Sequence, residues 1–212
     1  MTADPGVDPW PSTVSPLVLA SASPRRSDIL NQLGIDHEVH ASSIEEVPRA
    51  GEPPEAQAER LAREKALQVA SELSGRRVLA GDTMVALGDE VMGKPRDAEE
   101  AMRILLRLAG RQHRVVSALA LRLPGAPDRI RSGVQVTLVR FRAFDEVDAR
   151  AYVATGEPMD KAGAYGIQGL GAALVEEIEG DYSGVVGLPV PLLLGLLEWG
   201  GTPYRFPTPA AP

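Results

Sequence analysis

The apolar positions of this chain follow two periods, one typical of strands and the other typical of helices. In residues 134–139, valine and leucine alternate with Gln135, Thr137 and a further valine, which indicates a half-buried antiparallel strand. Residues 57–73 instead repeat apolar positions every three to four residues, as one face of a helix does. We expect strands at residues 17–20, 37–40, 78–80, 84–87, 90–92, 115–123, 130–141 and 174–178. We expect helices at residues 24–33, 57–73, 97–108, 144–155 and 188–199.

The order of these elements indicates the fold class. Strand–helix units occur beside long antiparallel strands, which favours an α/β fold with a mixed sheet flanked by helices. No linker divides the chain, so we expect one domain over residues 16–200, with a hairpin-rich middle that can form a second lobe. Residues 1–15 and 201–212 are rich in Pro, Gly, Thr and Ala, and we expect both to be flexible tails.

Composition narrows the classes of function. The 212 residues carry a net charge of -7 and contain no cysteine. The acidic balance argues against a nucleic-acid binder, and the lack of cysteine excludes a disulfide, a thiol nucleophile and a thiolate metal site. No apolar run reaches the length of a membrane span, and the N-terminus lacks a secretion pattern. We therefore expect a cytoplasmic protein with neither nucleic acid nor a membrane as its partner.

The turn between the first strand and the first helix has the features of an anion site. Pro24 suits the first position of a helix, and Ser23 before it suits the N-cap. A helix N-terminus presents free N–H groups and positive potential, and Arg25 and Arg26 add guanidinium groups that suit phosphate oxygens. From these residues alone, an equally good interpretation is that the turn binds no anion and that both arginines are solvated on an ordinary first turn of a helix.

Two further turns carry charged residues. Asp82 follows the apolar run at 78–80, and ligands of α/β proteins commonly bind beyond the ends of such strands. An aspartate there can bind a metal or deprotonate a water, and the alternative is a turn aspartate that caps its own backbone. Lys94 lies between a glycine and a proline, where it can serve as a phosphate counter-charge or remain a solvated loop lysine.

The segment 160–169 combines three glycines with an acid, a base, an aromatic residue and an amide. Gln168 can both donate and accept hydrogen bonds at a base edge, and Tyr165 can stack or pack. A flexible surface loop is the alternative. The three histidines lack metal-ligand spacing, and we expect His113 to pack at the entry of a strand.

Taken in order, these stretches resemble the Maf family of nucleoside triphosphate pyrophosphatases over nearly the whole chain. The matching motifs are Leu19-Ala-Ser-Ala-Ser-Pro-Arg-Arg26, Glu45-Glu46, Arg63-Glu-Lys-Ala66, Gly81-Asp-Thr83, Gly93-Lys-Pro-Arg-Asp97, Asp160-Lys-Ala-Gly-Ala-Tyr-Gly-Ile-Gln-Gly169 and Val185-Val-Gly-Leu-Pro189. The resemblance implies a long twisted sheet with a cleft between two lobes, like that of the inosine triphosphate pyrophosphatases. It also implies hydrolysis between the α and β phosphates of a nucleoside triphosphate.

The resemblance also implies roles for individual residues. Asp82 matches the proton acceptor, and Glu46 with Asp82 matches the positions that bind a divalent cation, Mg²⁺, Mn²⁺ or Co²⁺. The residues that match phosphate-handling positions are Ser21, Arg26, Lys65 and Lys94. The residues that match the positions linked to nucleotide choice are Arg25, Thr83 and Gln168, and they resemble the dTTP/UTP subgroup, which also hydrolyses some modified pyrimidine triphosphates.

Some features leave alternatives open. The segment Ser42-Ser43-Ile44 adds no further acid before Glu46, so metal ligation rests on few carboxylates. A nucleotide-sensing regulator of septum formation, with little turnover, is the second hypothesis. A homodimer is compatible with the sequence but is not indicated by any motif.

Overall fold

The structure is a computed structural model, and it describes residues 10–11, 13–126 and 128–207. Most of the predicted N-terminal tail and residues 208–212 of the C-terminal tail therefore lie outside the described residues. Within the described parts of these segments, Trp10 packs into the larger core cluster and Thr202 is buried.

The described residues form one seven-stranded sheet in the order β2-β1-β3-β5-β6-β7, with β4 paired to β3. The three strands β2, β1 and β3 are parallel, and the remaining pairs are antiparallel. The strands are β1 (Leu17–Leu19), β2 (His37–Val39), β3 (Val78–Leu87), β4 (Glu90–Met92), β5 (Gln112–Arg122), β6 (Ile130–Phe141) and β7 (Val175–Glu179). The predicted mixed α/β sheet is confirmed.

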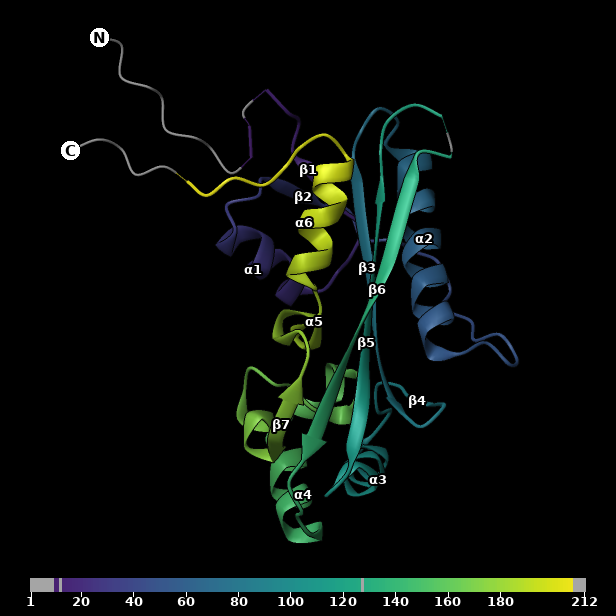
Figure 1. The fold of residues 1–212 in the computed structure, drawn as a ribbon. Helices are drawn as coiled ribbons and strands as arrows, with labels where there is room; N and C mark the ends of the chain where they lie inside the picture. Colours follow the sequence, from purple (N-terminus) through teal and green to yellow (C-terminus); the bar gives the residue numbers. More distant parts are fainter. Residues whose placement is uncertain (1–9, 12, 127, 208–212) are drawn as a thin grey trace, which may run out of the picture.

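Helices cover both sides of this sheet (Figure 1). The α-helices are α1 (Pro24–Gln32), α2 (Pro54–Glu72), α3 (Ala98–Leu108), α4 (Glu146–Ala154), α5 (Tyr182–Val186) and α6 (Val190–Trp199). Three 3₁₀ turns follow α4, namely η1 (Glu157–Asp160), η2 (Ala162–Ala164) and η3 (Leu170–Leu174). The long strands β3, β5 and β6 run through the whole molecule, with α1, α2 and α6 around one half and α3, α4 and β7 around the other.

The two faces of the sheet carry two separate cores. Even-numbered residues of β3, such as Ala80 and Met84, pack with α2 in the smaller cluster. Odd-numbered residues, such as Leu79 and Val85, join the larger cluster with α1, α3 and α6. Because successive side chains of a strand point to opposite faces, residues 82 and 83 must also face opposite sides of the sheet.

The local signals at helix ends are largely confirmed. Asp97 caps α3, since its carboxylate accepts a hydrogen bond from the backbone N–H of Glu100 at 2.7 Å. Gly34 has a φ of +67° just beyond α1, a conformation that glycine adopts without strain. Ser23 occupies the N-cap position of α1, but its side chain makes no capping hydrogen bond.

The predicted end of the strand at residues 78–80 is wrong, because the strand continues beyond residue 80. The structure has one strand, Val78–Leu87, that includes Asp82 and Thr83. Its residues pair with β5 without interruption from Val78 to Ala86, so Gly81 does not break the extended conformation. The short helix α5 was not expected either, and α2 begins earlier than predicted, at Pro54.

The site depends on where β1 stops. Strand β1 pairs with β3 only at Val78 and Leu79, and β4 pairs with β3 only from Val85 onward. Within the described part of the chain, residues 80–84 of β3 therefore have no strand beside them on that edge. Asp82 lies on this open edge, beside the end of its neighbour β1 rather than beyond the end of its own strand.

Candidate active site

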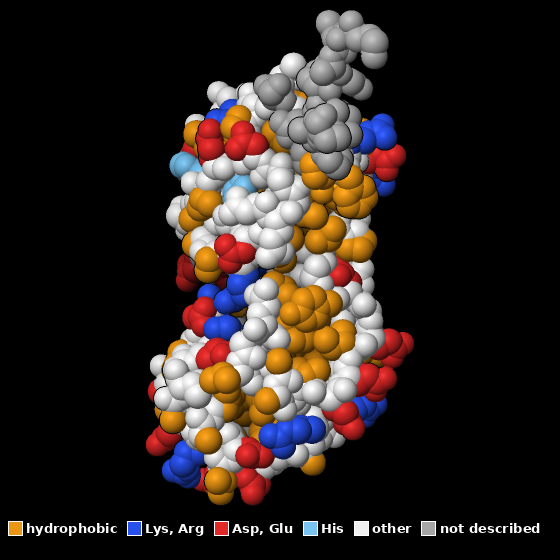
Figure 2. Space-filling view, turned by 90° about the vertical axis from the view of Figure 1, so that its left-hand side faces the viewer, with side chains coloured by type: hydrophobic (Ala, Val, Ile, Leu, Met, Phe, Trp, Pro, Cys, Tyr) orange, Lys and Arg blue, Asp and Glu red, His pale blue; other side chains and the backbone are white. Residues whose placement is uncertain are grey.

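A cavity of about 650 Å³ lies along the open edge of β3, between the two halves of the molecule. Its lining includes every residue that the sequence assigned to the site, namely Ser21, Arg25, Arg26, Glu46, Lys65, Asp82, Thr83, Lys94 and Gln168. The space-filling view shows Lys and Arg side chains gathered between the upper and lower halves (Figure 2). The fold thus brings together residues that are up to 147 positions apart, from Ser21 to Gln168.

On the α2 side of β3, one lysine contacts two carboxylates. The Lys65 ammonium lies 2.6 Å from Asp82 Oδ1 and 2.6 Å from Glu46 Oε1. Lys65 and Asp82 are buried, whereas Glu46 is more exposed. Partial burial raises the pKa of Glu46, but the hydrogen bond from Lys65 and the nearby cations outweigh it and hold this pKa below its usual range.

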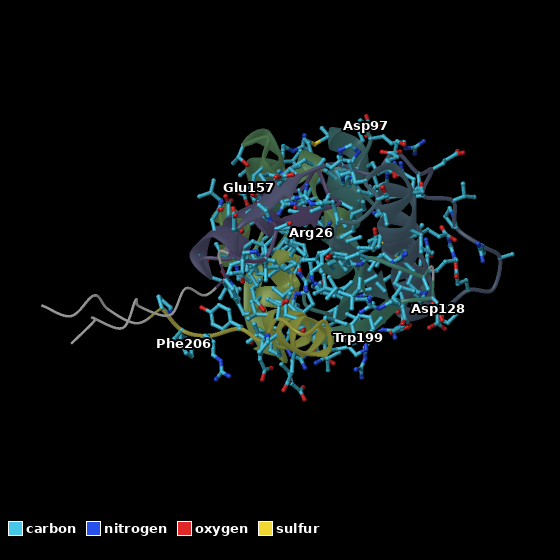
Figure 3. The ribbon with its side chains drawn as sticks, turned by 90° about the horizontal axis from the view of Figure 1, so that it is seen from above. Arg26, Asp97, Asp128, Glu157, Trp199 and Phe206 are labelled. Atoms are coloured by element: carbon cyan, nitrogen blue, oxygen red, sulfur yellow. The ribbon has the colours of Figure 1, made fainter. Side chains whose placement is uncertain are left out.

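On the opposite side of β3, Arg26 is buried and every guanidinium nitrogen is bonded to the protein. Its Nε donates to the Gly187 carbonyl at 2.8 Å, one Nη donates to Ser21 Oγ at 2.7 Å, and the other donates to Thr83 Oγ1 at 3.1 Å. Burial lowers the pKa of Arg26, and the charge of Asp82 opposes that shift. Seen from above, Arg26 lies near the middle of the molecule (Figure 3). Arg26 therefore joins the α1 turn, β3 and the segment after α5.

Thr83 is also bonded to a residue that the sequence analysis missed. Its hydroxyl lies 2.9 Å from the hydroxyl of Ser117, the residue opposite it on β5. The Ser117 hydroxyl donates in turn to the Gly184 carbonyl at 2.6 Å. Ser117 could have been found only from the pairing register of β3 and β5, and a single sequence does not reveal that register.

Arg25 has a different environment from Arg26. It is about one-third exposed, and its guanidinium lies 3.4 Å from the carboxylate of Asp160 in η1. The hydrogen bond from Lys161 is the main reason why the pKa of Asp160 is lowered. The first turn of α1 and the 160–169 segment therefore meet across the cavity, as the predicted cleft requires.

The segment that carries Gln168 is held by Glu157, which the sequence analysis did not single out. One carboxylate oxygen of Glu157 accepts hydrogen bonds from Tyr152 Oη at 2.8 Å and Gly171 N at 3.0 Å, and the other accepts from Leu170 N at 2.8 Å. Tyr152 Oη accepts in addition from Gly166 N at 3.1 Å. Figure 3 shows Glu157 nearer the edge of the molecule than Arg26. The segment thus has its backbone held by hydrogen bonds on both sides of Gln168, which argues against the alternative of a flexible surface loop.

Glu157→Gln should weaken this loop, because an amide nitrogen would face N–H or O–H donors in place of a carboxylate oxygen. We expect a loss of about 1–3 kcal/mol in the free energy of unfolding and a raised KM for a nucleoside triphosphate, the substrate class that the family resemblance implies. Chemical denaturation and steady-state kinetics measure both quantities. The exposed Glu176 provides the control, since Glu176→Gln should change neither. An unchanged KM in Glu157→Gln would contradict the role of this carboxylate in the site.

Tyr165 of this segment packs against His113 of β5. Tyr165 is buried, and its hydroxyl lies 2.9 Å from His113 Nε2. Both rings make edge contacts with Phe141. Burial lowers the pKa of His113 to about 4, so this histidine is neutral at physiological pH. The expectation that His113 packs is confirmed.

Two carboxylates of the cavity, Glu46 and Asp82, are suitable ligands for a divalent cation that phosphate groups of a bound ligand also coordinate. Among the described residues, no group of three or more His, Cys, Asp or Glu side chains is arranged to hold a metal ion. Glu46 and Asp82 are nevertheless brought together around Lys65. Mg²⁺ is often held by one or two carboxylates together with substrate phosphates and waters, and this pair fits that donor set.

These features define an α/β protein whose cavity sets cationic side chains beside a pair of carboxylates, an arrangement suited to a polyphosphate ligand. Residues 16–199 match the family described as Maf-like protein, and the chain belongs to the Maf family. In the described part of the chain, none of the helices has both the length and the apolarity that a membrane crossing needs.

Curated relatives match most of the chain. A dTTP/UTP pyrophosphatase of Myxococcus xanthus is 53% identical over 187 residues, covering 88% of this chain and 93% of its own. A dTTP/UTP pyrophosphatase of Desulfotalea psychrophila is 50% identical over 84% of this chain and 91% of its own. Among solved structures, the Ham1 protein of Staphylococcus aureus aligns with 60% of this chain and 72% of its own, at 16% identity and a TM-score of 0.41.

Proposed function

We propose that this protein is a nucleotide pyrophosphatase that hydrolyses dTTP and UTP to the nucleoside monophosphate and pyrophosphate. The observation that carries the proposal is the single cavity in which Lys65 contacts both Asp82 and Glu46 while Arg25, Arg26 and Lys94 line the same space. The names of relatives at 45–53% identity support the same reaction.

The charges of the cavity suit the leaving group. A nucleoside triphosphate carries several negative charges, and cleavage at the α phosphate moves more charge onto the departing pyrophosphate. Lys65 and Lys94 supply ammonium groups, and the first turn of α1 supplies free N–H groups beside Arg25. In this proposal these groups bind the phosphates and stabilise pyrophosphate as it leaves.

Asp82 acts as the general base in the proposed reaction. Its carboxylate accepts a proton from a water, the water oxygen forms a bond to the α phosphorus, and the bond from the α phosphorus to the bridging oxygen breaks. The contact from Lys65 fixes the orientation of Asp82 Oδ1 and leaves Oδ2 for the water. When bound, a divalent cation held by Glu46 and Asp82 would neutralise phosphate charge.

The remaining part of the cavity suits a pyrimidine base. Gln168 lines the same cavity as the apolar residues Val185, Val186 and Ile167, and its amide can both donate and accept hydrogen bonds at a base edge. In this proposal, Arg25 and Thr83 also help to determine which base is bound. Modified pyrimidine triphosphates fall within the same proposed substrate class.

An assay of pyrophosphate release tests the reaction. Wild-type protein should release pyrophosphate from dTTP and UTP faster than from purine triphosphates, in the presence of Mg²⁺, Mn²⁺ or Co²⁺. In water labelled with ¹⁸O, the label should appear in the monophosphate, because the attack is at the α phosphorus. Label in pyrophosphate, or release of inorganic phosphate alone, would refute the proposed reaction.

Gln168→Ala should flatten the preference for dTTP and UTP over purine triphosphates. A site that hydrogen-bonds its substrate disfavours other ligands by leaving its polar groups unpaired, and alanine removes those groups. Comparing kcat/KM for dTTP and GTP in the two proteins measures the change. A wild-type protein that prefers GTP would overturn this view of the pocket.

A nucleotide-sensing regulator with little turnover is the second candidate, and no observation favours it over the enzyme. The pairing of Asp82 with Lys65 and Glu46 is unnecessary for a receptor that only binds nucleotide. Absence of pyrophosphate release together with tight binding of dTTP would favour the regulator. A cytoplasmic location and a homodimer remain predictions.

A further inference from the structure

The hydroxyl groups of Thr83 and Ser117 form a chain of hydrogen bonds with a fixed direction. It begins at the Arg26 guanidinium, passes through Thr83 Oγ1 and Ser117 Oγ, and ends at the Gly184 carbonyl. An arginine can only donate and a carbonyl can only accept, so both ends of this chain are fixed. Ser117 is fully buried and makes no contact with the cavity, whereas Thr83 is only partly buried and lines it.

The fixed ends determine the position of each hydroxyl proton. Ser117 has one proton and donates it to Gly184, so Ser117 can only accept from Thr83. Thr83 therefore donates its own proton to Ser117 and accepts one from Arg26. One lone pair of Thr83 Oγ1 remains for a ligand. Toward the cavity, Thr83 is an acceptor and not a donor.

This direction limits what Thr83 can contact. Phosphate oxygens only accept hydrogen bonds, so they gain nothing from a threonine that has no proton to give. Thr83 also lies on the face of β3 that carries Val85, opposite the face of Asp82 and Lys65. Val85 and Val115 of this face line the cavity as well. Thr83 thus borders the apolar part of the cavity, which suits a base.

Pyrimidine bases differ in the group that they can present to such an acceptor. Uracil and thymine have a single ring N–H, at N3, whereas N3 of cytosine is itself an acceptor. We propose that Ser117 is a positioning residue that orients the Thr83 hydroxyl, so that Thr83 accepts a hydrogen bond from N3–H and the site selects uracil and thymine over cytosine. This inference rests on the proposed function and specifies how its substrate is chosen.

Ser117→Ala tests the inference without altering any cavity-lining residue. Loss of the Ser117 acceptor frees the Thr83 proton, so Thr83 can rotate and donate to N3 of cytosine. The ratio of kcat/KM for UTP to that for CTP should fall by about tenfold, the effect of one hydrogen bond. Ser132→Ala is the control, since it removes a bonded hydroxyl from the adjacent strand β6 outside the cavity lining, and its ratio should match the wild type.

Substrate analogues test the same contact in the wild-type protein, so the result does not depend on how well Ser117→Ala folds. The triphosphate of pyrimidin-2-one riboside has an acceptor at N3 but lacks the amino group of cytosine, and N3-methyl-UTP lacks the N3 proton. Both should be cleaved at least about tenfold less efficiently than UTP. The 3′-deoxy analogue of dTTP, which lacks the sugar hydroxyl as a donor, should be affected less.

The outcomes separate this inference from the proposed function. Efficient cleavage of UTP with an unchanged UTP/CTP ratio in folded Ser117→Ala would overturn the inference alone. So would efficient cleavage of the pyrimidin-2-one analogue, or a larger loss with the 3′-deoxy analogue than with N3-methyl-UTP. A wild-type protein that cleaves neither dTTP nor UTP would overturn the proposed function, and the inference with it.

Discussion

Asp82→Asn is expected to lower kcat for dTTP by about 10²–10⁴-fold, the usual contribution of a general base. Asparagine has nearly the same shape as aspartate and keeps an oxygen that can accept the hydrogen bond from Lys65. Its neutral amide cannot take a proton from water. The variant should therefore fold and bind nucleotide while its turnover is largely lost.

Steady-state kinetics of pyrophosphate release, together with calorimetric titration of dTTP, would separate chemistry from binding. Asp89→Asn is the matched control, because the Asp89 side chain is fully exposed and lies outside the lining of the cavity. Turnover of dTTP by Asp82→Asn at the wild-type rate would remove Asp82 from the mechanism. Loss of folding in that variant would instead show that the carboxylate is needed for stability.

Lys65→Met is expected to affect both stability and activity. The Lys65 and Asp82 side chains are about one-tenth exposed, and removing one partner of a buried ion pair typically costs about 3–5 kcal/mol. Methionine fills a similar volume but leaves the carboxylates of Asp82 and Glu46 without their shared cation. Denaturant unfolding at neutral pH measures the loss in the free energy of unfolding. Lys94→Met is the control, because Lys94 is exposed, and it should change this free energy by no more than about 0.5 kcal/mol.

The stability difference between wild type and Lys65→Met should depend on pH. In the wild type the pKa of Glu46 is lowered, so this group stabilises the folded state above its unfolded pKa and loses that effect as the pH falls through its folded pKa. The variant lacks the main source of this stabilisation. The difference should therefore be largest at neutral pH and shrink below roughly pH 4. Glu46 is more than half exposed, so its share is small.

Much of the site could be predicted because its motifs are local. The strand, turn and helix around Pro24 follow from an apolar run, a capping position and a proline, which all act within a few residues. Asp97 and its capping bond to Glu100 are predictable for the same reason. The assignment of the cavity residues came from the order of motifs that resemble one family, and the structure brings those residues together.

The parts that could not be predicted depend on contacts between distant segments. Gly81 and Asp82 favour a turn by local preference, but continuous pairing with β5 keeps them in a strand. Ser117 and Glu157 act through partners on other elements, and no local pattern marks them. The two arginines of α1 are adjacent in sequence, yet Arg26 is buried among protein acceptors while Arg25 is partly exposed.

The open edge of β3 has a consequence for how this scaffold can diversify. Asp82 and Thr83 are neighbours in the chain, but they face opposite sides of the sheet, and the strand residues around them pack into separate cores. Under the proposed function, mutations that reshape the base pocket on the Thr83 face would leave Asp82 and Lys65 in place on the other face. A lineage can therefore acquire a new nucleotide preference in small steps without losing its chemistry at any of them.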